Sequence, residues 1–320
     1  MEYIKKIEIS NYKSIEHLVI EDCRKFNLLI GYPNVGKSNI LEALSLISQF
    51  AQKENINKFC RFQSYFNLFH LGNIEEPIVV TLNDRSKLEF RVINKLNYLT
   101  SFYKKDEKGD YAKFDSPYNT HFYIKKYHFK EGTKNINSNE KYLDIPYGEN
   151  LITIFQLNKE LRKEAASILN LYDLILNVDI EKSELRLQKY TSEDTILSIP
   201  YELVADTIQR ILFYSAAILS NENSILLFEE PEAHLFPPYI KRMIANISND
   251  ERGNQYFINT HSPYVLETLI EDKEIRDQLS IYIVYHKGGE SKIKRVDDKQ
   301  LIRIAQYGND LFFNLENFIN

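Results

Sequence analysis

The sequence has few of the features that stabilise secreted domains or anchor a chain in a membrane. Its 320 residues include only two cysteines, Cys23 and Cys60, which do not form a C-x-x-C pair. This argues against a disulfide framework and a zinc cluster, and it fits a reducing cytoplasm. No apolar run approaches membrane-spanning length, and the N-terminal stretch alternates apolar and polar residues, unlike a signal peptide. We therefore expect a soluble, cytoplasmic protein that does not contact a membrane.

The chain also lacks an excess of positive charge, with 40 Lys and Arg against 45 Asp and Glu. The net charge of -5 argues against a protein that wraps nucleic acid over its whole surface, although a local basic patch stays open. There is no Trp, but 22 Tyr and 19 Phe contribute to a hydrophobic fraction of 43%, which is enough for a sizeable core. Because this length is near the upper limit for one core, we predict a single domain over residues 1–320 that carries an inserted sub-domain.

Strands and helices alternate along much of the chain. Residues 1–30 indicate three short strands, and the helical spacing of "SNILEALSLISQFAQ" follows them. Later, the buried strands "SILLFE" and "QYFINT" are each followed by a helix, "PPYIKRMIANI" and "SPYVLETLI". This order predicts an α/β fold around a mainly parallel sheet. We also predict a hairpin turning at Asn83-Asp84, helices over 158–176 and 201–219, a strand "ELRLQKY", a hairpin turning at Gly288-Gly289 and a short closing helix.

Residues 94–150 are rich in Lys, Tyr, Phe and Asn, and we predict an inserted β-rich arm or sub-domain there. Such a surface can stack bases and hold phosphates, so contact with DNA or RNA is one interpretation. The other is a Lys-rich solvated sheet whose aromatic residues form a small core of their own. The second is favoured because Asp106, Glu107, Asp110 and Asp115 interrupt the basic run.

The stretch "GYPNVGKS", residues 31–38, fits the phosphate-loop pattern G-x-x-x-x-G-K-[ST]. Its glycines let backbone N–H groups turn toward phosphate oxygens. The lysine reaches the β- and γ-phosphates, the serine hydroxyl binds Mg²⁺, and the following helix points its positive end at the same anion. A chance match in a glycine turn is the alternative, and the strand before and helix after argue against it. We predict a site for ATP and Mg²⁺ that uses Gly31, Asn34, Val35, Gly36, Lys37, Ser38 and Asn39.

Two adjacent glutamates end a buried strand in "ILLFEEPEAHLFPP", residues 225–238. Carboxylates there are costly unless a cation meets them, and a magnesium nucleotide provides one. Glu229 then stands where the metal-directed acid of a Walker B strand sits, and Glu230 orients and polarises the attacking water. The alternative is that the strand ends at the surface and both glutamates are only solvated. The phosphate loop argues against that alternative.

A third strand, "QYFINT", ends on His261. Ligands of open α/β sheets bind at the carboxyl ends of the strands, so His261 is expected at the same edge as Lys37 and Glu230. There it can contact the γ-phosphate or the water. A second interpretation is a helix start, with Ser262 as the cap and Pro263 in the first turn, and both can hold.

Three stretches together resemble a known family: "IEISNYKSIEHLVIEDCRKFNLLIGYPNVGKSNILEAL", "ILLFEEPEAHLFP" and "NTHSPYVL". They are similar to the ABC-type ATPase heads of the RecF, SMC and OLD group. The likeness is closer to the group's stand-alone bacterial ATPases, many of which belong to anti-phage systems, and it covers roughly residues 1–50 and 195–270. It implies a P-loop fold with a β-rich lobe and an inserted arm or coiled coil. It also implies a homodimer or an assembly of dimers, because two heads of this group sandwich two ATP molecules.

The resemblance assigns roles residue by residue. It implies that Lys37 and Ser38 are ligands of the phosphates and of magnesium, that Glu229 is the Walker B acid and Glu230 the catalytic base, and that His261 is the switch histidine. The segment "AHLFP" corresponds to the D-loop, which crosses the dimer interface in this group.

The sequence departs from the family pattern at two places. The signature loop, S-x-G before a helix, is expected near residue 205, where the chain reads "LVADTIQR". Ala205 stands near the usual serine and Thr207 near the usual glycine, so the contact with the opposite γ-phosphate is in doubt or is made by Thr207 and the helix N-terminus. For the Q-loop, Gln63 in "RFQSYF" is a weak candidate, and an ordinary surface residue is the alternative.

No second catalytic domain is expected after His261. OLD nucleases carry a toprim domain there, and the remaining stretch of about 60 residues is too short for one. We therefore expect an ATPase without nuclease activity of its own, which dimerises around ATP and controls a separately encoded effector protein, a nuclease or a toxin. The alternatives are an ATP-sensing scaffold with negligible turnover and a DNA repair ATPase, for which the arm is short.

Overall fold

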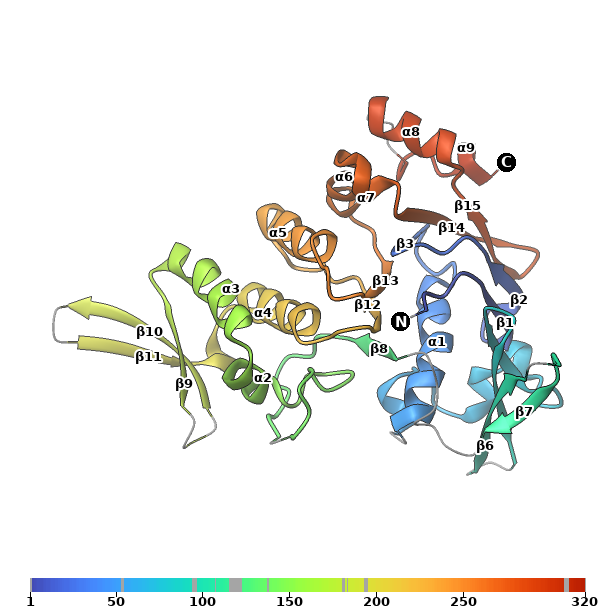
Figure 1. Cartoon of the computed structure of the whole chain (residues 1–320), viewed down its shortest axis with the longest axis horizontal. Helices are drawn as coiled ribbons and strands as arrows, with labels where there is room; N and C mark the ends of the chain where they lie inside the picture. The colour runs from blue at the N-terminus through green and yellow to red at the C-terminus, as the bar shows by residue number, and fades with distance from the viewer. Residues whose placement is uncertain are drawn as a thin grey trace. The chain divides into compact units, whose positions relative to one another are not determined.

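The computed structural model describes residues 2–52, 55–93, 97–106, 108–114, 123–136, 138–179, 182, 184–192, 195–307 and 311–319. The chain divides into two compact units. The first comprises Met1–Lys126, Asn223–Glu230 and Asn254–Asn320, and the second comprises Tyr127–Glu222 and Pro231–Gly253. Figure 1 shows the elements of both units. Among the described residues, no helix is both long and apolar enough to cross a bilayer.

The first unit contains a six-stranded, mainly parallel sheet in the order β15-β14-β3-β13-β12-β8. Strands β14, β3, β13 and β12 are parallel, and β15 pairs antiparallel with β14. Every residue of β3 and β13 is buried, as expected for strands covered on both faces. The bounds are β3 Phe26–Ile30, β8 Ile124–Tyr127, β12 Ile225–Glu229, β13 Gln255–Asn259, β14 Leu279–Lys287 and β15 Glu290–Arg295.

A second sheet of the first unit is antiparallel, in the order β2-β1-β4-β5-β6-β7. The predicted hairpin joins β4 to β5 through residues 83–85. The Arg85 N–H donates to the Leu82 carbonyl at 3.0 Å, and the two central residues of this tight turn, Asn83 and Asp84, have φ angles of 51° and 54°. The bounds are β1 Ile7–Tyr12, β2 Ile15–Ile20, β4 Ile78–Leu82, β5 Ser86–Val92, β6 Tyr98–Lys105 and β7 Tyr111–Phe114.

Helix α1, Lys37–Gln52, contacts β1 of the antiparallel sheet and both β12 and β13 of the parallel sheet, while β15 contacts β2. The helix that follows the glycine loop is therefore held between the two sheets. The predicted helix after β13 is α6, Pro263–Glu271; Ser262 stands at its N-cap, but within the described residues its side chain makes no cap bond. The unit also contains α7 Lys273–Arg276, α8 Asp298–Tyr307, α9 Glu316–Ile319 and short 3₁₀ turns at Ile56–Lys58, Tyr65–Leu68 and His70–Gly72.

The second unit combines helices with a small antiparallel sheet in the order β11-β10-β9. Helix α4 packs against α2, α3 and α5, and α3 packs on β9. The bounds are α2 Leu151–Leu157, α3 Lys159–Leu169, α4 Asp206–Leu219, α5 Pro237–Ser248, β9 Ile175–Asp179, β10 Glu184–Ser192 and β11 Thr195–Pro200. Strand β10 confirms the prediction made for "ELRLQKY".

Two helix boundaries of the second unit differ from the prediction. The helix expected over 158–176 ends at Leu169, because Asp173 is left-handed (φ 56°) and β9 begins two residues later. The helix expected over 201–219 begins only at Asp206. Ala205, the residue before this helix, has a non-helical backbone (ψ 136°). The carbonyl of Val204 accepts a hydrogen bond from the Gln209 side chain (2.7 Å) in place of a helical backbone N–H.

The described residues of segment 94–150 are divided between the two sheets of the first unit and the second unit. Strands β6 and β7 belong to the antiparallel sheet, β8 is an edge strand of the parallel sheet, and residues from Tyr127 onward belong to the second unit. The Lys87 ammonium lies 4.9 Å and 4.7 Å from the ring centres of Tyr103 and Tyr111. Glu107 and Asp115, with 94–96, 116–122 and 137, lie outside the described residues. A single domain with an inserted arm stays a prediction.

Candidate functional site

A cavity of about 330 Å³ opens at the carboxyl ends of β3, β13 and β12 in the first unit. Three segments that are far apart in sequence meet there because their strands are neighbours in one sheet. Of the predicted site residues, Gly31 and Val35 are not among its lining, and all the others are. The lining residues are Pro33, Asn34, Gly36, Lys37, Ser38, Asn39, Arg61, Glu229, Glu230, Asn259 and His261.

The glycine loop is fitted tightly against the β14–β15 hairpin. A Cβ atom at Gly31 would lie 2.2 Å from the carbonyl oxygen of Val284, and one at Gly36 would lie 2.1 Å from Ser291 Oγ. Gly36 also has a φ of 102°, which side chains rarely adopt. The Ser291 hydroxyl donates to the carbonyl of Val35 at 2.7 Å. These contacts explain why the pattern needs glycine at both positions.

Lys37 folds back over this loop. Its side chain donates to the carbonyl oxygens of Gly31 and Tyr32, both at 2.8 Å, and the residue is 4% exposed. Burial lowers the pKa of Lys37 to about 8, and the charge of Glu230 opposes this shift. A nearly buried ammonium thus faces the cavity without direct screening by bulk water.

Ser38 and Asn259 both contribute side-chain oxygen atoms to the lining of the cavity. Asn259 Nδ2 donates to Ser38 Oγ at 3.4 Å. Asn259 is 1% exposed, and its Oδ1 has no hydrogen-bond partner among the described residues. A buried oxygen without a partner is costly and is unusual away from functional sites. Asn259 was not predicted, although it ends the strand that delivers His261.

Glu229 is held between two cations. Its Oε1 lies 3.3 Å from Arg61 Nη2, and its Oε2 lies 3.4 Å from Lys126 Nζ. Neither cation was predicted, because neither belongs to a motif; Arg61 stands two residues before Gln63. Gln63 itself is exposed and is absent from the described lining of the cavity.

Glu230 and His261 face each other across neighbouring strand ends. Glu230 has a left-handed backbone (φ 45°), a costly conformation for a residue with a side chain, and its N–H donates to the carbonyl of Asn259 at 2.9 Å. Its Oε1 lies 3.7 Å from His261 Nε2. Burial and the charge of Lys37 lower the pKa of His261, and Glu230 opposes this. The imidazole is therefore largely neutral at pH 7.

The segment expected to carry the signature loop is bonded within the second unit. The Thr207 hydroxyl donates to the carbonyl of His234 at 3.0 Å. Asp206 Oδ2 lies 2.9 Å from Arg210 Nε and 3.0 Å from His234 Nδ1. Thr207 thus connects the start of α4 to the "AHLFP" segment of its own chain.

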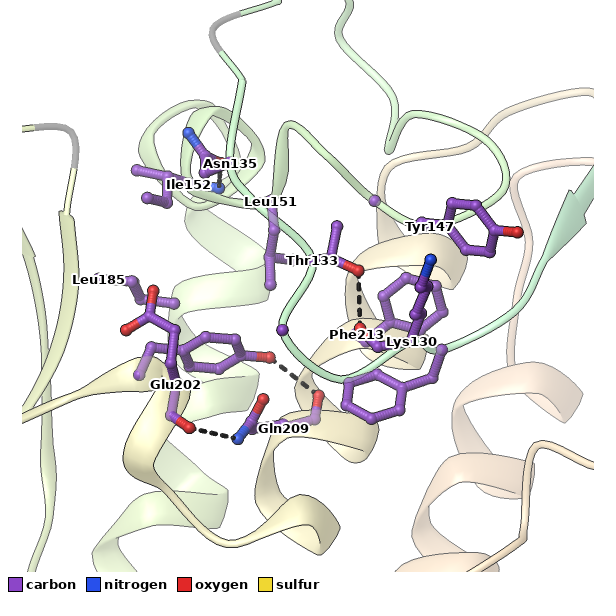
Figure 2. Close-up of a pocket in the computed structure, with 14 residues that line it drawn as sticks. Lys130, Thr133, Asn135, Tyr147, Leu151, Ile152, Leu185, Glu202, Gln209 and Phe213 are labelled. Carbon is purple, nitrogen blue, oxygen red and sulfur yellow. Dashed lines mark hydrogen bonds between the residues drawn. The ribbon is translucent and has the colours of Figure 1, made fainter. Parts of the chain in front are cut away.

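A second cavity lies inside the second unit and has a different character (Figure 2). Its volume is about 40 Å³. Figure 2 shows Gln209 bonded to the carbonyl of Glu202, within a largely apolar lining. The lining comprises Phe129, Lys130, Gly132, Thr133, Asn135, Tyr147, Gly148, Leu151, Ile152, Leu185, Tyr201, Glu202, Gln209 and Phe213. Neither its size nor its charge suits a triphosphate, so the cavity at the strand ends is the candidate site.

Known proteins share parts of this sequence. A protein of Helicobacter pylori named "ATP/GTP phosphatase" is 21% identical, and the match covers 98% of each chain. "Protein ea59" of Escherichia phage lambda is 29% identical over 48% of this chain and 27% of its own length. "Septu protein PtuA" of Bacillus mycoides is 25% identical over 84% of this chain and 39% of its own length. The chain thus spans well under half of the last two relatives.

Solved structures share the fold. A structure of "the SmcHead bound to the C-winged helix domain of ScpA" superposes with a TM-score of 0.57 at 15% identity, covering 95% of this chain and 100% of the other. An Smc head with an extended coiled coil, bound to a ScpA domain derived from Pyrococcus furiosus, gives 0.53 at 13% identity, covering 95% and 98%. The fold is that of an SMC/ABC-type ATPase head. A family model also matches residues 26–267, a span that includes the glycine loop and His261, and the chain therefore belongs to the family described as "AAA domain, putative AbiEii toxin, Type IV TA system".

Proposed function

We propose that the protein binds and hydrolyses ATP in the cavity at the ends of β3, β13 and β12. The observation that carries this proposal is the convergence of Lys37, Glu230 and His261 on one cavity from three adjacent parallel strands. Family membership and the relative named "ATP/GTP phosphatase" support nucleotide hydrolysis. The relative's name also makes GTP a substrate worth testing.

The residues of the cavity suit a magnesium nucleotide. Mg²⁺ prefers oxygen ligands, and the cavity is lined by Ser38, Glu229 and Asn259, whose Oδ1 has no hydrogen-bond partner within the described part of the chain. When bound, the ion neutralises charge on the phosphates. Ser38 and Glu229 are the residues proposed to hold it. The loop from Gly31 to Asn39 would bind the phosphates, with Lys37 as the principal cation.

Glu230 is the proposed catalytic base. Its side chain and that of His261 are 46% and 38% exposed, so water reaches the space between them. Glu230 can accept the proton of the attacking water, and a carboxylate positioned in this way contributes roughly 10²–10⁴-fold to a rate. His261, neutral because its pKa is lowered, can hold the water or the γ-phosphate by a hydrogen bond.

We further propose that two copies of the chain dimerise around ATP. The resemblance to ABC-type heads supports this arrangement, in which "AHLFP" crosses the interface. The bond between Thr207 and His234 ties the two segments that would face the partner, so movement of one would move the other. Thr207 and the start of α4 are the proposed replacement for the missing signature glycine.

The ATP state is proposed to control a separately encoded effector protein, a nuclease or a toxin, in anti-phage defence. The family description names a toxin system, and the likeness to a Septu protein supports a defence context. Segment 94–150 and the chain after His261 are the proposed docking places, because none of their described residues lines the cavity. A scaffold with negligible turnover is the second candidate, and the departure at Ala205 and Thr207 favours it.

Isothermal titration with ATP and with GTP tests the proposed site. Wild type should bind with Mg²⁺, and Lys37→Ala should abolish binding, because no other side chain of the loop supplies that charge. Wild-type affinity in Lys37→Ala would place the nucleotide elsewhere. Co-purification of the tagged protein with the products of its neighbouring genes, with and without ATP, tests the effector. A stable complex with a neighbour that changes with ATP is expected.

The chain alone is not expected to cut nucleic acid. Phosphodiester hydrolysis usually needs carboxylates grouped around metals, and Glu229 and Glu230 are committed to the nucleotide. Plasmid, linear DNA, single strands and tRNA should stay intact with ATP and either Mg²⁺ or Mn²⁺. Cleavage that survives Lys37→Ala but is lost on changing acids elsewhere would contradict this expectation.

A further inference from the structure

Lys126 is a buried lysine on the metal side of the candidate site. It lies on β8, the strand next to β12 in the parallel sheet, and it is 5% exposed. Its ammonium lies 3.4 Å from Glu229 Oε2 and donates to the carbonyl of Phe59 at 3.0 Å. Burying an ammonium is costly, so its pairing with Glu229 at the end of β12 is a built feature and not a surface encounter.

The two cations on Glu229 are not equivalent. The Arg61 side chain is 71% exposed, and it also pairs with Glu42, with Arg61 Nε 2.8 Å from Glu42 Oε1. Water therefore screens the Arg61 charge, although both of its carboxylate partners are largely buried. The Lys126 side chain is 6% exposed, so water screens its charge far less. Lys126 is therefore the less screened of these two cations beside the Glu229 carboxylate.

We propose that Lys126 is a positioning residue of the metal site, which holds Glu229 toward the cavity and competes with the divalent cation for Oε2. Lys126 thereby sets the Mg²⁺ concentration that nucleotide binding requires. The inference rests on the proposed function, since it takes Glu229 as the residue that receives the metal. It goes beyond that function because it assigns control of the Mg²⁺ requirement to Lys126, which belongs to none of the motifs recognised in the sequence.

The direction of the effect follows from the charges. A dication that approaches Glu229 is repelled by the Lys126 ammonium. This ammonium is buried, whereas the Arg61 side chain is exposed. If the Lys126 charge is removed, the largely buried Glu229 carboxylate loses a neighbouring cation, and this loss favours the binding of a metal ion to Glu229. Removing one positive charge a few ångströms from the metal-binding carboxylate should change the Mg²⁺ midpoint on the order of tenfold.

The neighbouring lysine provides a matched control. Lys125 is on the same strand and is 6% exposed, but successive side chains of a strand point to opposite faces of the sheet. Lys125→Met therefore removes a lysine of similar burial whose side chain is expected on the other face of the sheet. Lys126→Arg keeps the positive charge at the site and tests whether charge is the property that matters.

The experiment measures nucleotide binding and not turnover. A fluorescent, non-hydrolysable ATP analogue is titrated with Mg²⁺ from an EDTA baseline against wild type, Lys126→Gln, Lys126→Met, Lys126→Arg and Lys125→Met. The Gln and Met variants should reach half-saturation at an Mg²⁺ concentration about tenfold lower than wild type. The Arg variant and the Lys125 control should stay within about twofold of wild type. The same titration in a Glu229→Gln background should show a clearly smaller effect of Lys126→Gln, because part of the effect acts through the Glu229 carboxylate.

An unchanged Mg²⁺ midpoint in folded Lys126→Gln overturns the proposal, as does an effect that is equally large without the Glu229 charge. If thermal unfolding shows that neither neutral variant folds, Lys126→Arg decides, and a lowered midpoint there contradicts the role of the charge. Failure of the proposed function gives a different result. In that case wild type itself would not bind the analogue at any Mg²⁺ concentration, and the inference would fall with it.

Discussion

His261 Nε2 lies 3.7 Å from Glu230 Oε1, and the register of two parallel strands brings them together. Glu229 at the end of β12 pairs with Asn259 at the end of β13, and the next N–H, that of Glu230, donates to the carbonyl of Asn259. Backbone hydrogen bonds between the two strands therefore fix the positions of Glu230 and His261. Catalytic groups need to be positioned with this precision.

Gly36→Ala should abolish nucleotide binding and destabilise the fold. The new Cβ would lie 2.1 Å from Ser291 Oγ, at a φ of 102° that alanine rarely adopts. We expect a loss of at least about 2 kcal/mol in the free energy of unfolding and no measurable ATP affinity. Gly109→Ala is the control, because Gly109 also has a positive φ (88°) but nothing lies within 4 Å of the added atom. Wild-type ATP affinity in Gly36→Ala would contradict the loop geometry.

ATP affinity should fall as the pH rises through the pKa of Lys37. That pKa is about 8 in the free protein, because burial disfavours the charged form. The triphosphate favours the charged form, so binding raises the pKa and the complex takes up a proton when the free lysine is partly neutral. Well below pH 8 the lysine is charged in both states and no uptake is expected.

Isothermal titration in buffers with different ionisation enthalpies, over about pH 6.5 to 9.5, measures both effects. Affinity that does not change up to the highest pH, together with no proton uptake near pH 8, would show that Lys37 does not carry the binding charge.

Glu42→Gln should destabilise the first unit. Glu42 on α1 is 0% exposed, accepts from the Tyr12 hydroxyl at 3.1 Å and pairs with Lys13 and Arg61. Removing one partner of a buried ion network costs about 3 kcal/mol, which urea unfolding can measure. Glu184→Gln is the control, since its exposed pair with Arg186 should contribute less than about 1 kcal/mol. Equal unfolding midpoints for the two variants would contradict the structural role of Glu42.

Residues from three predicted strand ends line one cavity, and this convergence could be expected from the sequence. The phosphate loop, Glu229–Glu230 and His261 each follow a buried apolar run, and parallel strands bring such ends to one edge. Local patterns also located the turn at Asn83 and Asp84.

Arg61 and Lys126 could not be predicted in the same way. Each reaches Glu229 from a segment without a motif, and only the sheet order, with β8 next to β12, brings Lys126 to the site. The predicted start of helix α4 at residue 201 was wrong for a related reason. The Gln209 side chain binds the carbonyl of Val204 in place of the backbone, and such competition is not visible in helical periodicity.

Single-turnover hydrolysis of ATP by wild type and Glu230→Gln, with and without DNA, tests the central claim most directly. Glu230→Gln should bind ATP as wild type does but hydrolyse it at least about 10²-fold more slowly, because an amide can hold the water but cannot accept its proton. Glu267→Gln, at an exposed position of α6, should match wild type in both measurements. Equal hydrolysis rates for Glu230→Gln and wild type would remove Glu230 from the catalytic role and favour an ATP-sensing scaffold.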